Sequence, residues 1–331
     1  MKQHRVLIGD CIESMRTLQD QSINTCVTSP PYFGLRDYGM AGQIGLEETP
    51  AEFVSRLVDV FREVKRVLRD DGTLWLNLGD SYCSTAPGTK NAPQSKGSAK
   101  NPEQWANARP KTPPGLKPKD LIGIPWLVAF ALQADGWFLR QDIIWQKPNP
   151  MPESVTDRCT KSHEYIFLLS KSQRYHFDHV AIKEEAIGGQ TGNATTFKRE
   201  GSKREKSIPG HAYGTHRPDR KEAHYSGEKR NRRSVWSVAT RPFKGAHFAT
   251  FPTDLIRPCI LAGAPVGGVV LDPFGGAGTT AVVAMQEGRK SILCELNPEY
   301  AAMAERRIAA SWLDGSAQMD VFQDTAQHPA A

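Results

Sequence analysis

The turn Ser29-Pro30-Pro31-Tyr32 carries the residues of this sequence best suited to chemistry. Its two prolines stop the β-prone run 24–28 and leave a stiff loop at a strand end. The Ser29 side chain and the Pro30 carbonyl offer two hydrogen-bond acceptors, and proline contributes no competing N–H donor. Two acceptors can hold both hydrogens of an amine and aim its lone pair at an electrophile. Because Tyr32 can stack on a planar ring, the turn predicts group transfer to the amine of a base turned out of its helix.

A second segment, Asp272 to Gly278, has the features of a nucleotide cradle. The predicted strand 269–272 ends there, glycines allow close backbone approach, and a helix begins near residue 279. Glu295 ends the next predicted strand, roughly 20 residues on, where a carboxylate can accept hydrogen bonds from ribose hydroxyls. The glycines also satisfy the GxGxxA pattern of NAD-dependent enzymes, so a dehydrogenase stays open at this point, as does a glycine turn without a ligand.

Alternating β-prone and amphipathic segments surround these two motifs. Strands are predicted at 6–8, 24–28, 73–78, 143–145, 165–169, 269–272 and 291–295, and helices at 12–18, 51–68, 126–132, from 279 and after 298. A turn is expected at Asp70-Asp71-Gly72. This alternation predicts an α/β fold with one catalytic core, in which strand ends gather the chemistry at one sheet edge.

Composition divides the chain into three parts. Residues 1–187 are predicted to form the catalytic half of the core, with a mobile loop near 81–119 that is rich in Pro, Gly, Ser, Lys and Asn. Residues 188–244 are strongly basic and read as an insertion that could contact phosphates and base edges, with a solvated basic loop as the alternative. Residues 245–331 are predicted to form the cofactor-binding half of the core.

Overall composition excludes several classes of protein. The hydrophobic fraction is 39%, and no apolar run is long enough to span a membrane. The amino terminus turns polar too early for a secretory signal, which predicts a cytoplasmic protein. Six scattered cysteines form no CxxC pair, so buried reduced thiols are expected rather than a metal site or disulfides. A net charge of +6 permits a polyanionic partner.

The ordered motifs resemble those of the amino-methylating DNA methyltransferases, in the permuted class whose catalytic motif precedes the cofactor motif. The resemblance covers nearly the whole chain. It is carried by Gly9-Asp10, Thr28 to Tyr32, Trp145-Gln146-Lys147-Pro148-Asn149-Pro150, His247 to Pro252, Asp272 to Gly278, and Glu295 to Tyr300. It implies a Rossmann-like S-adenosylmethionine-dependent methyltransferase fold, with a mixed central sheet and an inserted target-recognition region.

The resemblance also implies roles for single residues. Ser29, Pro30, Pro31 and Tyr32 would form the catalytic loop, and Asp10, Phe251, Asp272, Phe274, Gly276, Gly278 and Glu295 would bind S-adenosylmethionine. Within that set, Phe274 and the glycines would surround the methionine part, Phe251 would help close its pocket, Glu295 would bind the ribose and Asp10 would lie at the adenosine end. Helix capping is an equal alternative for Asp10, and a structural role is favoured over catalysis for His247.

A serine at the head of the Pro-Pro-Tyr motif is commoner in family members that make N4-methylcytosine, so cytosine is the favoured target and N6 of adenine the alternative. An RNA or protein amide methyltransferase and a silent DNA-binding module remain further alternatives. The expected partners are double-stranded DNA and a cognate restriction endonuclease. A bacterial or phage enzyme associated with the nucleoid, as a monomer or homodimer, would fit this restriction-modification context.

Overall fold

The computed structural model describes residues 3–35, 37–83, 112–186, 229–240 and 251–327, with side chains described up to residue 313. The chain divides into two compact units. The main unit comprises residues 1–178 and 233–331, and the second unit comprises residues 179–232. In the second unit, β6 (Glu184–Glu185) pairs antiparallel with β7 (Lys229–Arg230). An ion pair of 2.9 Å between Arg230 and Glu184 joins these two short strands.

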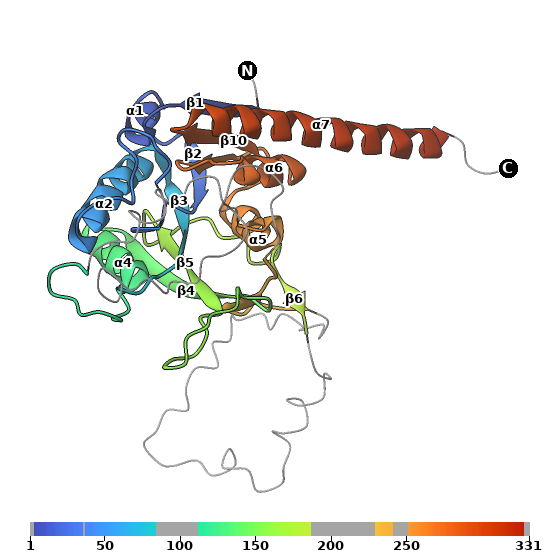
Figure 1. The fold of residues 1–331 in the computed structure, drawn as a ribbon. Helices are drawn as coiled ribbons and strands as arrows, with labels where there is room; N and C mark the ends of the chain where they lie inside the picture. The colour runs from blue at the N-terminus through green and yellow to red at the C-terminus, as the bar shows by residue number, and fades with distance from the viewer. Residues whose placement is uncertain (1–2, 36, 84–111, 187–228, 241–250, 328–331) are drawn as a thin grey trace, which may run out of the picture. The chain divides into compact units, whose positions relative to one another are not determined.

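An eight-stranded mixed sheet forms the centre of the main unit (Figure 1). Its order is β1 (His4–Ile8), β10 (Lys290–Glu295), β9 (Val269–Asp272), β2 (Ile23–Thr28), β3 (Leu68–Leu78), β5 (His163–Ser170), β4 (Phe138–Gln146) and β8 (Val235–Ser237). Among these eight strands, β5 alone runs antiparallel to its neighbours. The mixed sheet confirms the predicted fold class.

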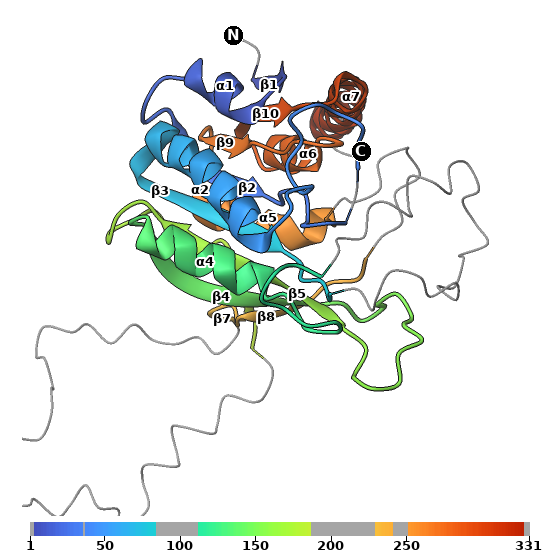
Figure 2. The same cartoon turned by 60° about the vertical axis from the view of Figure 1, so that its left-hand side comes forward.

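Helices cover both faces of this sheet (Figure 2). Helices α1 (Cys11–Arg16), α2 (Pro50–Val67) and α4 (Ile124–Ala134) lie on one face, and α5 (Thr253–Gly263), α6 (Thr279–Gln286) and α7 (Pro298–Gln327) lie on the other. Parallel strands joined through helices leave both faces to be covered, which is the layered solution expected for an α/β sequence.

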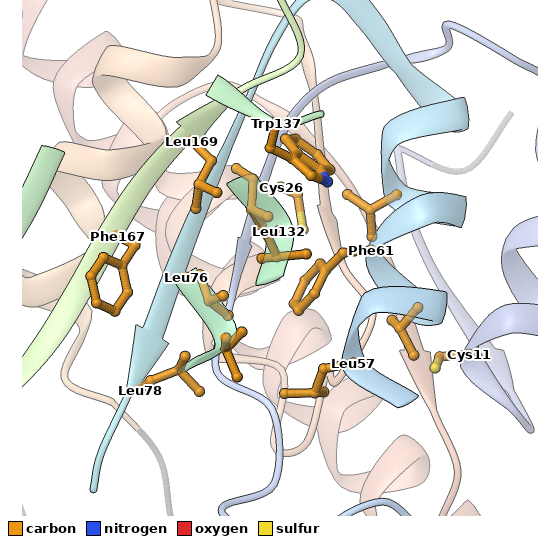
Figure 3. Close-up of a cluster of buried hydrophobic side chains, with 14 of the residues drawn as sticks. Cys11, Cys26, Leu57, Phe61, Leu76, Leu78, Leu132, Trp137, Phe167 and Leu169 are labelled. Carbon is orange, nitrogen blue, oxygen red and sulfur yellow. The ribbon is translucent and has the colours of Figure 1, made fainter. Parts of the chain in front are cut away.

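Helix α2 shows how the sequence specifies one of these layers. Thr49 and Glu52 form a capping box, and Pro50 occupies the first turn, where its missing N–H costs nothing. Apolar residues then recur every three or four positions, which places one stripe of the helix against the sheet. Figure 3 shows that stripe, with Leu57 and Phe61 facing Leu76 and Leu78 of β3.

Three parts of the structure differ from the sequence-based predictions. The expected turn at 70–72 lies inside β3, where pairing with β2 jumps from Ile23–Leu68 to Thr25–Thr73 and the intervening residues bulge. Residues 235–237, predicted to lie in the basic insertion, form β8 and pair with β4. Helix α5 was not predicted. Residues 84–111 of the predicted mobile loop and residues 187–228 of the basic insertion lie outside the described residues.

The cysteines are unpaired, as predicted, but they are not all buried. Cys11, Cys26, Cys83, Cys259 and Cys294 are buried, whereas Cys159 is exposed. Burial holds the pKa of the Cys26 thiol well above its usual range, so this thiol stays protonated and behaves as a small apolar side chain. Within the described ranges, no cluster of His, Cys, Asp and Glu is placed to hold a metal, and no helix has the length and apolar character needed to span a membrane.

Candidate active site

The two sequence motifs meet at one edge of the central sheet. Strands β2 and β9 are parallel neighbours, so Thr28 and Asp272 end their strands side by side. The Thr28 hydroxyl donates a hydrogen bond of 2.6 Å to Asp272 Oδ1, although 244 positions separate the two residues in the chain. The start of the proline turn is therefore fastened directly to the start of the glycine turn, at the edge where α/β folds place their ligands.

Asp272 organises this junction from a buried position. Besides the bond from Thr28, its carboxylate accepts a hydrogen bond of 2.7 Å from the Thr280 hydroxyl and one of 3.0 Å from the Phe274 N–H. Burial raises the pKa of Asp272, and the three hydrogen bonds oppose that shift. Because both carboxylate oxygens are engaged by the protein, Asp272 holds the strand ends together.

A cavity of about 770 Å³ opens where the motifs meet. Predicted site residues that line it are Asp10, Ser29, Pro30, Pro31, Tyr32, Phe251, Asp272, Phe274, Gly276 and Glu295. Gly278 is not among the described lining residues. A Cβ there would lie 2.8 Å from the Ala304 Cβ, so this glycine allows α6 to begin close against α7. A cavity of this size is typical of small-molecule and cofactor sites.

Glu295 is held rigidly at the end of β10. Its Oε2 accepts a hydrogen bond of 2.7 Å from the Gly276 N–H, and its Oε1 accepts one of 2.9 Å from the Asn297 N–H. Burial raises the pKa of Glu295, and the two backbone hydrogen bonds oppose that shift. A carboxylate has about four acceptor positions. Each oxygen thus keeps acceptor capacity for a ribose hydroxyl.

Asp10 caps a helix and also lines the cavity. Its Oδ1 caps helix α1 by accepting hydrogen bonds of 2.9 Å from the Ile12 N–H and 3.1 Å from the Glu13 N–H. The same half-buried side chain lines the cavity. Capping and contact with a ligand are therefore compatible in this geometry. His247, for which a structural role was favoured, lies outside the described residues.

Glycines shape the floor of the cavity between Asp272 and α6. Gly276 adopts a left-handed conformation with φ of 50°, which side-chain-bearing residues rarely adopt. At Gly275, a Cβ would lie 2.8 Å from the Leu293 Cβ, so only glycine lets this turn pass so close to β10. The turn consequently brings main-chain atoms to the cavity surface.

Tyr32 is fixed in the cavity wall from two directions. Its hydroxyl donates a hydrogen bond of 2.7 Å to Glu164 Oε2. Its ring packs against Gly79, where a Cβ would lie only 2.5 Å from Tyr32 Cε2. Burial, followed by the Glu164 carboxylate, holds the pKa of Tyr32 well above its usual range. The hydroxyl consequently stays protonated and remains a donor.

The structure adds three polar residues to which no role was assigned from the sequence, namely Asn77, Lys147 and Glu164. All three line the cavity. Lys147 Nζ pairs with Glu164 Oε1 and lies 4.4 Å from the centroid of the Trp145 ring. Asn77 Nδ2 donates a hydrogen bond of 3.0 Å to the Tyr165 carbonyl. A weak signal was present, since Asn77 is the polar exception in the apolar run 74–78 and Lys147 belongs to a motif that was noted without a function.

Residue Asn149 braces the cavity rim on the side of β8. Its Oδ1 accepts a hydrogen bond of 2.9 Å from the Thr240 N–H, and its Nδ2 donates one of 3.1 Å to the Thr240 carbonyl. Both residues line the cavity. A residue predicted to belong to the basic insertion therefore forms part of the wall.

Comparisons with known proteins agree with this architecture. A family model described as DNA methylase matches residues 23–306. The chain is 51% identical to the type II methyltransferase M.Cfr9I of Citrobacter freundii over 300 residues, which are 91% of this chain and 86% of the relative. It is 46% identical to the type II methyltransferase M.SmaI of Serratia marcescens over 308 residues, covering 93% and 91% of the two chains.

Solved structures show the same fold at low sequence identity. A putative DNA modification methylase from Thermus thermophilus, in complex with S-adenosyl-L-methionine, aligns with a TM-score of 0.55 and 23% identity over 93% of this chain and 95% of its own. The cytosine-N4-specific PvuII DNA methyltransferase aligns with a TM-score of 0.59 and 18% identity over 93% and 90%. The NAD-dependent alternative is therefore wrong. The chain belongs to the amino-methylating DNA methylase family and is an S-adenosylmethionine-dependent DNA methyltransferase of the type found in type II restriction-modification systems.

Proposed function

We propose that this enzyme methylates N4 of a cytosine that has been turned out of double-stranded DNA into the cavity. The observation that carries the proposal is the hydrogen bond between Thr28 and Asp272, which fastens the Ser29 turn to the glycine turn in one cavity. A methyl donor and an amine bound at these two turns would lie within reach of each other.

The amine end of the reaction is assigned to the Ser29 turn. An exocyclic amine is a weak nucleophile because its lone pair is delocalised into the ring. If the Ser29 side chain and the Pro30 carbonyl accept its two hydrogens, the lone pair is freed and aimed. S-adenosylmethionine supplies an electrophilic methyl group on a sulfonium. When the cofactor is bound, the methyl group would pass to the amine nitrogen as its bond to sulfur breaks, which would leave the thioether S-adenosylhomocysteine and release one proton to water.

The cofactor end is assigned to the other lining residues of the predicted set. Glu295 would accept hydrogen bonds from the ribose, and Asp10 would lie at the adenosine end. Phe274, Gly276 and Phe251 would surround the methionine part. For Gly278 and Asp272 we propose an indirect role in the cofactor pocket, because Gly278 lets α6 begin close against α7 and Asp272 already accepts three hydrogen bonds from the protein.

Cytosine is favoured over adenine because a serine heads the Pro-Pro-Tyr motif. Purified enzyme, S-adenosylmethionine and unmethylated duplex DNA provide the test, with nucleosides identified by mass spectrometry after digestion. N4-methylcytosine is the expected product. N6-methyladenine without N4-methylcytosine would refute the base assignment and leave the amino-methylation chemistry in place.

We assign recognition of the DNA sequence to the basic insertion predicted at 188–244. This segment partly overlaps the second unit, which comprises residues 179–232. Lysine and arginine side chains there would bind phosphates and base edges. A restriction endonuclease with the same target would complete the system, as the names of the relatives suggest. Sequencing of the modified DNA at single-base resolution would give the target, and protection of that site against cleavage would identify the endonuclease.

A further inference from the structure

The Tyr32 hydroxyl is one end of a polar network that spans three neighbouring strands. Glu164 accepts the Tyr32 hydrogen bond on Oε2 and pairs with Lys147 on Oε1. Asn77 lies 3.3 Å from the same Oε2 through its Nδ2, and its Oδ1 is 3.5 Å from the Tyr32 hydroxyl. The members come from β3, the end of β4 and the start of β5, together with the catalytic turn.

Sheet topology explains how these residues reach one place. Strand β5 runs antiparallel between β3 and β4, so its first residues lie at the edge where β3 and β4 end. Glu164 is paired in register with Trp145, two positions before Lys147. Because β5 is reversed, Glu164 near its start lies at the ligand edge of the sheet. In a parallel strand, only the last residues would lie at that edge.

The burial of this network makes a passive surface ion pair a poor explanation. The side chains of Lys147 and Glu164 are only 20% and 14% exposed. Removing paired charges from water is costly, and the pair often adds little net stability compared with apolar residues. In some proteins such pairs fix a geometry, and here the paired carboxylate is also the acceptor for the Tyr32 hydroxyl.

We propose that Glu164 is a positioning residue that locks the Tyr32 ring in the orientation needed to stack on the target base, with Lys147 holding Glu164 in place. This inference rests on the proposed function, in which Tyr32 stacks on the base. The hydroxyl held by Glu164 and the ring edge held against Gly79 together leave the ring little freedom to turn about its side-chain bonds. The stacking surface is therefore prepared before DNA binds.

A double-mutant cycle tests the coupling. Glu164→Gln weakens the acceptor of the Tyr32 hydrogen bond and breaks the charge pair with Lys147. Tyr32→Phe removes the donor of that hydrogen bond. Each variant is expected to lose roughly tenfold in single-turnover methyl transfer, since hydrogen bonds to charged groups contribute somewhat more than neutral ones. The double variant should be no slower than the slower single variant, because the hydrogen bond between Tyr32 and Glu164 can be lost only once and the charge pair is proposed to act on Tyr32 through it.

A spectroscopic readout separates positioning from general stability. Duplex DNA with a fluorescent base analogue at the target position should show weaker stacking quenching with Glu164→Gln than with the unaltered enzyme. S-adenosylmethionine affinity should not change. Glu287→Gln is the matched control, because Glu287 is also a partly buried, ion-paired glutamate, with 20% side-chain exposure, but is absent from the described cavity lining. It should leave methyl transfer and quenching unaltered.

Two results would overturn the inference. Multiplicative losses in the double variant would show that Glu164 acts independently of the Tyr32 hydroxyl, and unaltered transfer and quenching with Glu164→Gln would show that it has no positioning role. Failure of the proposed function is recognised separately. If the unaltered enzyme makes N6-methyladenine, the base assignment fails, while the cycle measured on that substrate still tests the coupling.

Discussion

Replacing Gly79 by alanine tests whether the position of the Tyr32 ring controls catalysis. An added Cβ would lie 2.5 Å from Tyr32 Cε2, 3.1 Å from Cζ and 3.2 Å from Cδ2. Carbon atoms in ordinary contact are about 3.5 to 4.0 Å apart. The ring must therefore move by roughly 1 Å, and the hydrogen bond of 2.7 Å to Glu164 prevents it from simply swinging away.

A displacement of about 1 Å at a reacting centre can cost on the order of 100-fold in rate. We expect Gly79→Ala to reduce single-turnover methyl transfer by about that factor. The affinity for S-adenosylmethionine should stay unchanged, because the glycine turn that we assign to the cofactor is elsewhere in the cavity. Gly79 does not have a positive φ, so alanine brings no backbone strain at this position.

The assay is transfer of a labelled methyl group to duplex DNA with enzyme in excess, accompanied by calorimetric titration of the cofactor. Tyr32→Ala supplies the control, because once the ring is removed the added methyl group at position 79 has nothing to displace. Gly79→Ala should then cause no further loss in that background. If Gly79→Ala alone transferred methyl groups at the wild-type rate, the reasoning would be refuted, because the Tyr32 ring could then move without an effect on catalysis.

Three further predictions concern the other end of the cavity. Glu295 has a raised pKa, so its carboxylate takes up a proton at a higher pH than an ordinary glutamate, and affinity for S-adenosylmethionine should fall as the pH drops through that raised pKa. Titration calorimetry from neutral to acidic pH should show this fall, whereas Glu295→Gln should bind more weakly with little dependence on pH. Asp272→Ala should lower the free energy of unfolding by about 3 kcal/mol in a urea titration, because two hydroxyls and one N–H lose their acceptor. An unsatisfied buried polar group usually costs about 1 to 3 kcal/mol. A decrease in unfolding free energy of less than about 1 kcal/mol would therefore contradict a structural role for Asp272 between the two strand ends. Asp10→Ser should keep the α1 cap and therefore the melting temperature, but it should lower the affinity for S-adenosylmethionine. If the variant binds the cofactor as tightly as the wild type does, Asp10 serves only as a helix cap.

Much of the fold could be predicted because local patterns and tertiary packing agree. Helix α2 carries its own capping box, an N-terminal proline and a continuous apolar stripe, so each local choice favours the same helix. Predictions failed where pairing partners decide the structure. Residues 235–237 were predicted to lie in the basic insertion, with no strand expected there, and they form a strand because the edge of β4 offers hydrogen bonds.

Both turns of the candidate site were visible in the sequence because proline restricts the backbone and glycine permits conformations that other residues avoid, so each marks a turn locally. Glu164 could not be found in that way. Its significance depends on an antiparallel strand that places it beside Tyr32, 132 positions earlier in the chain. A carboxylate at the start of an apolar strand has no local feature that distinguishes it from a solvated one.

The sequence by itself determined the chemistry available to this protein, since the types and order of its residues specify an amine-orienting turn, a glycine turn and the strands that precede them. Only the tertiary structure decided which groups act together. The Thr28–Asp272 bond and the Tyr32–Glu164 bond join residues distant in the chain, and such contacts exist only after the strands have been ordered in the sheet. The physical reason is that backbone preferences act over a few residues, whereas hydrogen bonds between side chains depend on distances that the whole fold sets.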